Sequence, residues 1–68
     1  SFVAMAQKVA TIGASDALTG PARRGDISTI QHHLGRLADD PELRAAYALL
    51  SSMILRAYGH PDHGHTDV

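Results

Sequence analysis

The sequence contains no cysteine among its 68 residues. A disulfide-rich scaffold and a Cys-ligated zinc module, two common ways of stabilising a small domain, are therefore excluded. A chain of this length buries only about 60% of the surface that its unfolded form exposes, so an independent core is marginal. The length fits one domain, which is either a self-contained helical module or a piece of a larger protein.

The sequence also lacks an excess of charge of one sign. Six Lys and Arg residues stand against seven Asp and Glu residues, and the formal net charge is -1 with His neutral. Because no Lys/Arg-rich stripe is present, no nucleic-acid partner is expected. No apolar run approaches the ~20 residues of a membrane span, and no basic segment precedes Phe2 as in a signal peptide, so a cytoplasmic protein without a membrane partner is expected.

No stretch of four or more residues alternates between apolar and polar types, so the sequence predicts an all-α fold with three main helices. The first helix begins at Phe2 and is apolar over most of its circumference, which requires packing partners on several sides. Its start has no initiating Met and no cap beyond Ser1, and we expect the chain to be a fragment.

The segment after Gly13 predicts a chain reversal. Either the first helix continues, or Ser15 and Asp16 cap a short second helix. In both cases Gly20-Pro21 is expected to end the helix, because Gly accepts the left-handed stop and Pro cannot extend a helix. Ala22 to Gly25 is then expected to form a short loop.

Two amphipathic helices are expected to follow this loop. The first runs from Ile27 to about Ala38 with Asp26 as its N-cap, and the second runs from Pro41 to about Tyr58 between an Asp40 cap and a Gly59 C-cap. The apolar faces comprise Ile27, Ile30, Leu34, Leu37 and Ala38 on the first, and Leu43, Ala46, Tyr47, Leu50, Ile54, Ala57 and Tyr58 on the second. Met5 and Met53 are expected in the core, and Tyr47 and Tyr58 are interpreted as packing residues.

Residues 1–59 are thus assigned to the helical domain and residues 60–68 to a polar, disordered tail. The tail carries His60, His63 and His65 with Asp62 and Asp67, which are suitable ligands for zinc or nickel. Because these residues lie at a terminus without a regular scaffold, only adventitious binding is expected and no metal site is predicted.

Two groups of residues are candidates for binding or catalysis. A helix N-terminus at Asp26 favours an anion, and Arg24 beside it offers a bidentate clamp for carboxylate or phosphate. The alternative is that Asp26 itself satisfies the free amide groups and that the arginines are solvated. Thr29 and His33 form a polar strip one turn apart, in which His33 is either a general acid or base or a boundary histidine bonded to a backbone carbonyl.

The string ALTGPARRGDISTIQHHLGRL resembles the signature of a bacterial helical domain of unknown function, which follows a Rossmann-like domain in predicted NAD(P)-dependent oxidoreductases. The resemblance covers roughly residues 2–58. The matching positions are Ala17, Leu18, Thr19, Gly20, Pro21, Arg24, Gly25, Asp26, Thr29, His33, Leu34 and Tyr47.

This resemblance implies a fold like the helical C-terminal domain of 6-phosphogluconate dehydrogenase and ketopantoate reductase, which binds substrate and forms a homodimer. It implies a missing N-terminal Rossmann domain, a small-molecule substrate, and NAD(P) as cofactor of the full-length protein. No cofactor and no activity are expected for this chain alone, which has no Gly-rich turn after a strand.

The resemblance also assigns site residues by analogy. Thr19 and His33 would contact the reacting carbonyl or hydroxyl, and the residues that would bind a substrate or cofactor anion are Gly20, Arg24, Gly25, Asp26 and Thr29. The alternative function is a free-standing helical module that dimerises through its apolar first helix and has no catalytic activity.

Overall fold

The computed structural model describes residues 1–13 and 16–61, which form four helices and no strand. In chain order the helices are α1 (Phe2–Gly13), α2 (Asp16–Arg24), α3 (Ile27–Arg36) and α4 (Pro41–Ala57). The all-helical prediction is therefore confirmed. The expected number of main helices was too low, because the segment after Gly13 forms a complete helix of its own.

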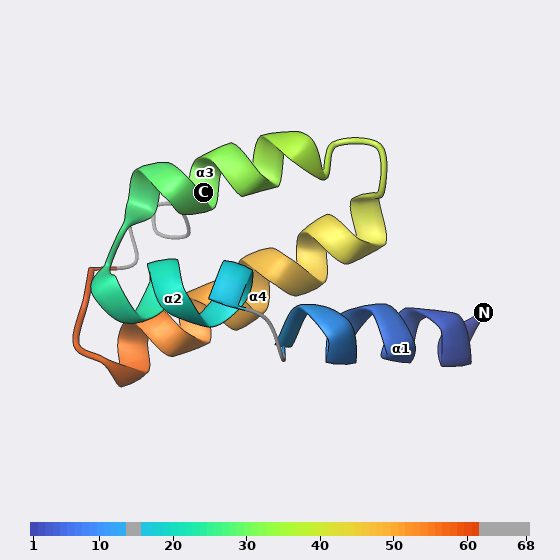
Figure 1. The fold of residues 1–68 in the computed structure, drawn as a ribbon, viewed down its shortest axis with the longest axis horizontal. Coiled ribbons are helices and arrows are strands. Elements are labelled where there is room, and N and C mark those ends of the chain that lie inside the picture. Colours follow the sequence, from blue (N-terminus) through green and yellow to red (C-terminus); the bar gives the residue numbers. More distant parts are fainter. Residues whose placement is uncertain (14–15, 62–68) are drawn as a thin grey trace.

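The longest helix, α4, contacts each of the other three, and its most extensive contact is with α2 (Figure 1). α3 lies along the opposite side of the fold from α1, and both flank α4. The core between them consists of five buried apolar residues, which are Leu18, Ala22, Ile30, Tyr47 and Leu55. Residues of all four helices meet at this core, because Ile12 of α1 also packs against it.

Most of the predicted apolar face of α3 is confirmed. Ile30 is buried, and Ile27, Leu34 and Leu37 pack against the core, whereas Ala38 lies in the following turn and is exposed. Asp26 caps the helix by accepting a hydrogen bond from the amide of Thr29 at 3.2 Å. The local pattern was sufficient here because one face of α3 meets the core.

The predicted apolar stripe of α4 is confirmed only in part, since Tyr47 is buried and Leu50 and Ile54 pack against the core, whereas Ala57 is exposed. Ser51, Ser52 and Leu55 are also buried, so the inward face of α4 extends beyond the predicted stripe. Met53 and Tyr58 are more than half exposed, and the expectation that Met53 fills the core is wrong. The helix α2, which the sequence left open as one of two alternatives, makes the most extensive contact with α4.

The prediction that Gly20-Pro21 ends a helix is also wrong, as is the loop at Ala22 to Gly25. Pro21 is buried inside α2, which continues to Arg24. The helix ends one residue later at Gly25, whose φ of 72° is the left-handed conformation. The amide of Asp26 donates to the Pro21 carbonyl at 2.8 Å, and the amide of Gly25 donates to the Ala22 carbonyl at 3.2 Å, which together make a Schellman stop.

The ends of α4 follow the sequence closely. Asp40 accepts a hydrogen bond from the Leu43 amide at 3.2 Å, and Gly59 has a φ of 74°. The amide of His60 donates to the Leu55 carbonyl at 2.8 Å, so this helix ends with the same motif as α2. Both caps were predicted, because a cap depends on residues that are close in the sequence.

The helix α1 packs less completely than the others, and none of its residues is buried. Its Lys8 ammonium lies 3.1 Å from the Asp40 carboxylate and so ties α1 to the start of α4. Phe2 and Val3 are 87% and 64% exposed. Within the described ranges, no helix combines the length and the hydropathy that crossing a membrane requires.

Candidate functional site

A small pocket lies where the four helices converge. Its volume is about 210 Å³, and it is lined by Ile12, Ala17, His33, Arg36, Leu37 and Tyr47. The lining is almost entirely apolar, and its polar groups come from His33, Arg36 and Tyr47. A larger and more open hollow between α1 and Leu43 contains Lys8 as its charged group, and Lys8 already pairs with Asp40. The four-helix pocket is therefore the better candidate site.

His33 and Tyr47 form the polar centre of this pocket. His33 Nδ1 lies 2.7 Å from Tyr47 Oη, and the two rings meet edge to face with centroids 5.7 Å apart. Tyr47 is 3% exposed, whereas His33 is only half-buried. The tyrosine thus supports the histidine from the core, while the histidine ring retains access to solvent and to small molecules.

A second hydrogen bond fixes the tyrosine hydroxyl. Tyr47 Oη donates to the Ala17 carbonyl oxygen at 3.2 Å. In a regular helix this carbonyl would accept from the amide of residue 21, but residue 21 is a proline and has no N–H group. The phenol therefore supplies the donor that the proline removes, and it joins α4 to the interior of α2.

This arrangement favours one tautomer of His33, the one in which both contacts of the Tyr47 hydroxyl are hydrogen bonds. A carbonyl oxygen can only accept, so the single phenol proton of Tyr47 is directed to Ala17. The short contact with His33 then requires Nδ1 to donate to the phenol oxygen. In the neutral imidazole this leaves Nε2 as an unprotonated acceptor, which is the form that a general base requires.

Burial reinforces this assignment. It raises the pKa of the Tyr47 phenol above its ordinary value, because the charged phenolate would lose hydration. The phenol consequently keeps its proton through the neutral pH range and remains a donor to Ala17. Tyr47 acts as a positioning residue for His33, a role that the sequence interpretation as a packing residue did not include.

The predicted anion-binding residues gather elsewhere, at the junction of α2 and α3. Asp26 accepts hydrogen bonds from the hydroxyls of Thr29 at 2.7 Å and Ser28 at 3.1 Å, in addition to the Thr29 amide. The hydrogen bonds from Thr29, together with the bond from Ser28 and the positive charge of the nearby Arg24, lower the pKa of this carboxyl. The carboxylate of Asp26 therefore occupies the position beside the α3 N-terminus where an external anion would bind.

Arg24 belongs to the same cluster. Its guanidinium lies 3.7 Å from the Asp26 carboxylate, and it folds back over Gly20, where an added Cβ would be 3.1 Å from Nη1. Its side chain is 63% exposed. Gly20, Arg24 and Asp26 are thus brought together as expected, and the arrangement matches the alternative in which Asp26 satisfies the amide groups.

His60, the residue after Gly59, lies against the junction of α2 and α3. His60 Nε2 donates to the Arg23 carbonyl oxygen at 2.6 Å, which satisfies a group at the C-terminal end of α2. The imidazole lies against Gly25, where an added Cβ would be 2.6 Å from Nδ1. His60 was grouped with the metal-ligating residues of the tail, but His63, His65, Asp62 and Asp67 lie outside the described residues. Within the described ranges no cluster of three His, Asp or Glu side chains could hold a metal.

The predicted site residues therefore divide between two places. His33 lines the pocket, whereas Gly20, Arg24, Gly25, Asp26 and Thr29 form the junction, and Thr19 is half-buried on α2. Tyr47 and Arg36 are pocket residues that the sequence analysis did not assign to the site. Arg36 follows His33 by one helical turn, and this spacing was the available signal.

Comparison with known proteins gives one family match. The model of a family described as "Domain of unknown function (DUF2520)" matches residues 3–54, which include both the pocket and the junction. No curated protein and no solved structure matches the chain.

Proposed function

The chain belongs to the DUF2520 family, and from this premise we propose that it is the substrate-binding and dimerisation portion of an NAD(P)-dependent oxidoreductase. A Rossmann domain would bind the nucleotide and supply the hydride chemistry. The described residues form helices only, so they include no strand with a Gly-rich turn after it. In this proposal the helices form a domain of the 6-phosphogluconate dehydrogenase C-terminal type in a bacterial, cytoplasmic enzyme.

The observation that carries the proposal is the orientation of His33 in the four-helix pocket. Interconversion of an alcohol and a carbonyl moves a proton to or from the oxygen, and a positioned histidine is a common acid or base for that step. The Tyr47 hydroxyl holds His33 with Nδ1 protonated, so Nε2 accepts the proton of a bound alcohol and returns it to a carbonyl oxygen in the reverse direction.

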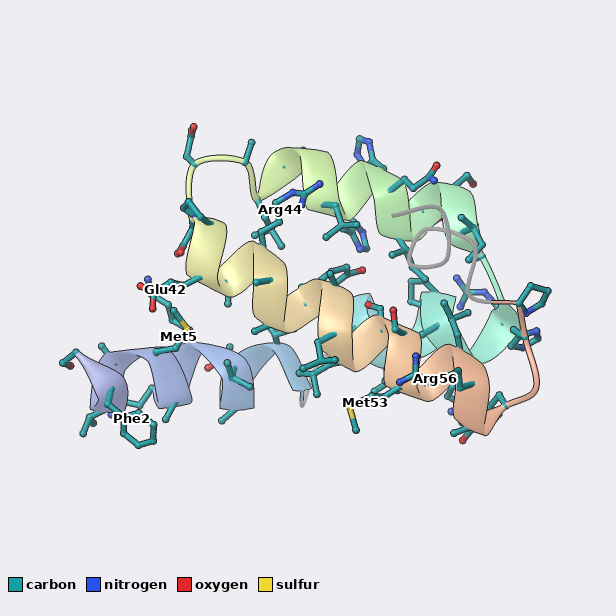
Figure 2. The ribbon with its side chains drawn as sticks, turned by 180° about the vertical axis from the view of Figure 1, so that it is seen from behind. Phe2, Met5, Glu42, Arg44, Met53 and Arg56 are labelled. Atoms are coloured by element: carbon teal, nitrogen blue, oxygen red, sulfur yellow. The ribbon has the colours of Figure 1, made fainter. Side chains whose placement is uncertain are left out.

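The dimerisation part of the proposal rests on exposed apolar surface. Phe2 of α1 is 87% exposed, and Leu49 and Met53 of α4 are 57% and 51% exposed. Figure 2 shows that the Phe2 and Met53 side chains extend from the same edge of the molecule. Large apolar side chains gathered on one edge are typical of a protein interface.

The test uses the full-length protein encoded by the gene. His33→Asn is expected to lower kcat by about 10²–10⁴ while the melting temperature stays within a few degrees. A lower melting temperature with an unchanged kcat would show that His33 has only a structural role. Absence of a nucleotide-binding domain in the gene, or of NAD(P)-dependent turnover, would refute the oxidoreductase assignment.

The exposed surface of α1 also supports the second candidate, a free-standing helical module that dimerises without catalysis. Sedimentation of the 68-residue chain tests dimerisation, and the reading frame of the gene together with the activity of its product separates the two functions. A stable helical dimer from an open reading frame that begins near Ser1 would favour the module. The same dimer within a longer chain that reduces a substrate with NADPH would favour the oxidoreductase.

A further inference from the structure

The helix α1 is attached to the fold less firmly than the other helices and lies at an outer edge of the molecule (Figure 1). None of its residues is buried, and its inward face consists of Met5, Val9 and Ile12, which are only half-buried. An open hollow of about 460 Å³ lies between α1 and Leu43 of α4. An element with few buried apolar contacts opens at a low free energy, so α1 is expected to separate from the fold more readily than α2, α3 or α4.

An ion pair ties α1 to the start of α4. The Lys8 ammonium lies 3.1 Å from Oδ2 of Asp40, while Oδ1 of the same carboxylate accepts the Leu43 amide at 3.2 Å and caps α4. The Lys8 side chain is 53% exposed. Because an ion pair this exposed is weak and is screened by salt, the contact can break and re-form without disrupting either helix.

The C-terminal end of α1 forms one wall of the His33 pocket. Ile12 lies in the last turn of α1 and is the residue that this helix contributes to the pocket lining. The other lining residues lie on α2, α3 and α4 or in the turn after α3. Separation of α1 would therefore remove the Ile12 wall and widen the access to His33, which is half-buried in the closed pocket.

We propose that α1 is a lid on the His33 pocket and that the Lys8–Asp40 ion pair is the latch that holds it closed. The five buried core residues all belong to α2, α3 and α4, so the core stays intact when α1 moves away. Opening breaks the latch and withdraws Ile12 from the pocket. The role of the lid in admitting a substrate rests on the proposed function, but the motion itself does not.

Amide hydrogen exchange of the 68-residue chain, followed by NMR, tests the latch. Lys8→Met removes the ion pair, and Asp40→Asn removes it while keeping an oxygen that caps α4, since Asn and Asp are equally good N-caps. Each variant is expected to raise the exchange rates of the α1 amides about two- to fivefold, and to leave those of α3 and α4 unchanged. Lys8→Arg keeps the charge and should retain most of the protection. The double variant should exchange no faster than either single variant.

Asp39→Asn is the matched control. It removes the same charge from the neighbouring residue, which is exposed and forms no ion pair with the residues that the structure describes. This variant should leave the exchange of α1 unchanged. Sodium chloride at about 0.5 M should raise the exchange rates of α1 in the unaltered chain but not in Lys8→Met, because salt screens only a pair that is present.

Modification by diethyl pyrocarbonate measures access to the pocket, with tandem mass spectrometry to assign the modified residue. Lys8→Met is expected to raise the rate at His33 about twofold or more, in proportion to the larger open fraction of α1. The neighbouring His32 is exposed on the same helix and serves as the internal control, so its rate should not change.

Exchange of α1 that is unaffected by Lys8→Met, or that rises equally in Asp39→Asn, would overturn the latch. Exchange that rises equally in all of the helices would overturn the lid, because it would show that the ion pair stabilises the whole fold. So would a His33 rate that stays constant while α1 exchanges faster. These outcomes leave the oxidoreductase assignment unaffected, whereas a confirmed lid in a gene product without NAD(P)-dependent turnover would refute only that assignment.

Discussion

Tyr47 Oη lies 3.2 Å from the carbonyl oxygen of Ala17 and gives it the hydrogen bond that Pro21 withholds. Tyr47 is thirty residues away in the sequence, so a tertiary contact maintains the interior of a short helix. The same hydroxyl accepts from His33. The stability of α2 and the orientation of the candidate acid or base therefore depend on one oxygen atom.

Tyr47→Phe should lower the free energy of unfolding by about 1–3 kcal/mol, because it leaves the Ala17 carbonyl without a donor. Pro21→Ala restores an amide at residue 21 and should reduce the cost of removing the hydroxyl. Urea denaturation of the two single variants and the double variant measures this coupling. Strictly additive losses would show that the proline and the tyrosine do not share the carbonyl.

The protonation state of His33 is a separate prediction. In the neutral ring the proton should lie on Nδ1, because the Tyr47 oxygen accepts a hydrogen bond there. Long-range ¹H–¹⁵N NMR spectra distinguish the two tautomers. Tyr47→Phe should remove the preference for Nδ1, whereas Tyr58→Phe, at an exposed position on the other end of α4, should not change it.

Gly25→Ala should destabilise the protein by about 1–2 kcal/mol, since the residue has a φ of 72° and a methyl group would meet the His60 ring. Gly35→Ala is the matched control in α3, where an added Cβ meets nothing within 4 Å. That change should be neutral or stabilising by about 0.5–1 kcal/mol. Similar melting temperatures for the two variants would contradict the role of Gly25 in the stop of α2.

Acid stability should depend on Asp26. Its hydrogen bonds to Thr29 and Ser28 lower its pKa in the folded state, so its contribution to stability is fully present above about pH 4 and is lost as the pH falls through the lowered pKa. Thermal melts of Asp26→Asn should therefore depend less on pH below about pH 4 than those of the unaltered chain. Asp39→Asn, in the exposed turn after α3, should leave that dependence intact.

The sequence alone was sufficient for the all-helical class, the starts of α3 and α4 at their aspartate caps, and the end of α4 at Gly59. Each of these depends on residues within about one helical turn, and the chemistry of a cap is local. The same local rules placed a helix end at Gly20-Pro21, and there they were wrong. The cost of a proline within a helix depends on whether another group can replace its missing donor, and that group is Tyr47 of α4.

The tertiary structure also decided the candidate site. His33 was identified from its position beside an apolar face, but its protonated nitrogen follows from Tyr47, and its pocket requires Ile12 and Ala17 from two other helices. The predicted anion-binding residues do lie together, and only the folded junction shows that Asp26 already accepts hydrogen bonds from Thr29 and pairs with Arg24. Sequence spacing determines which side chains share a helix face, whereas packing between helices determines which polar groups form hydrogen bonds with one another.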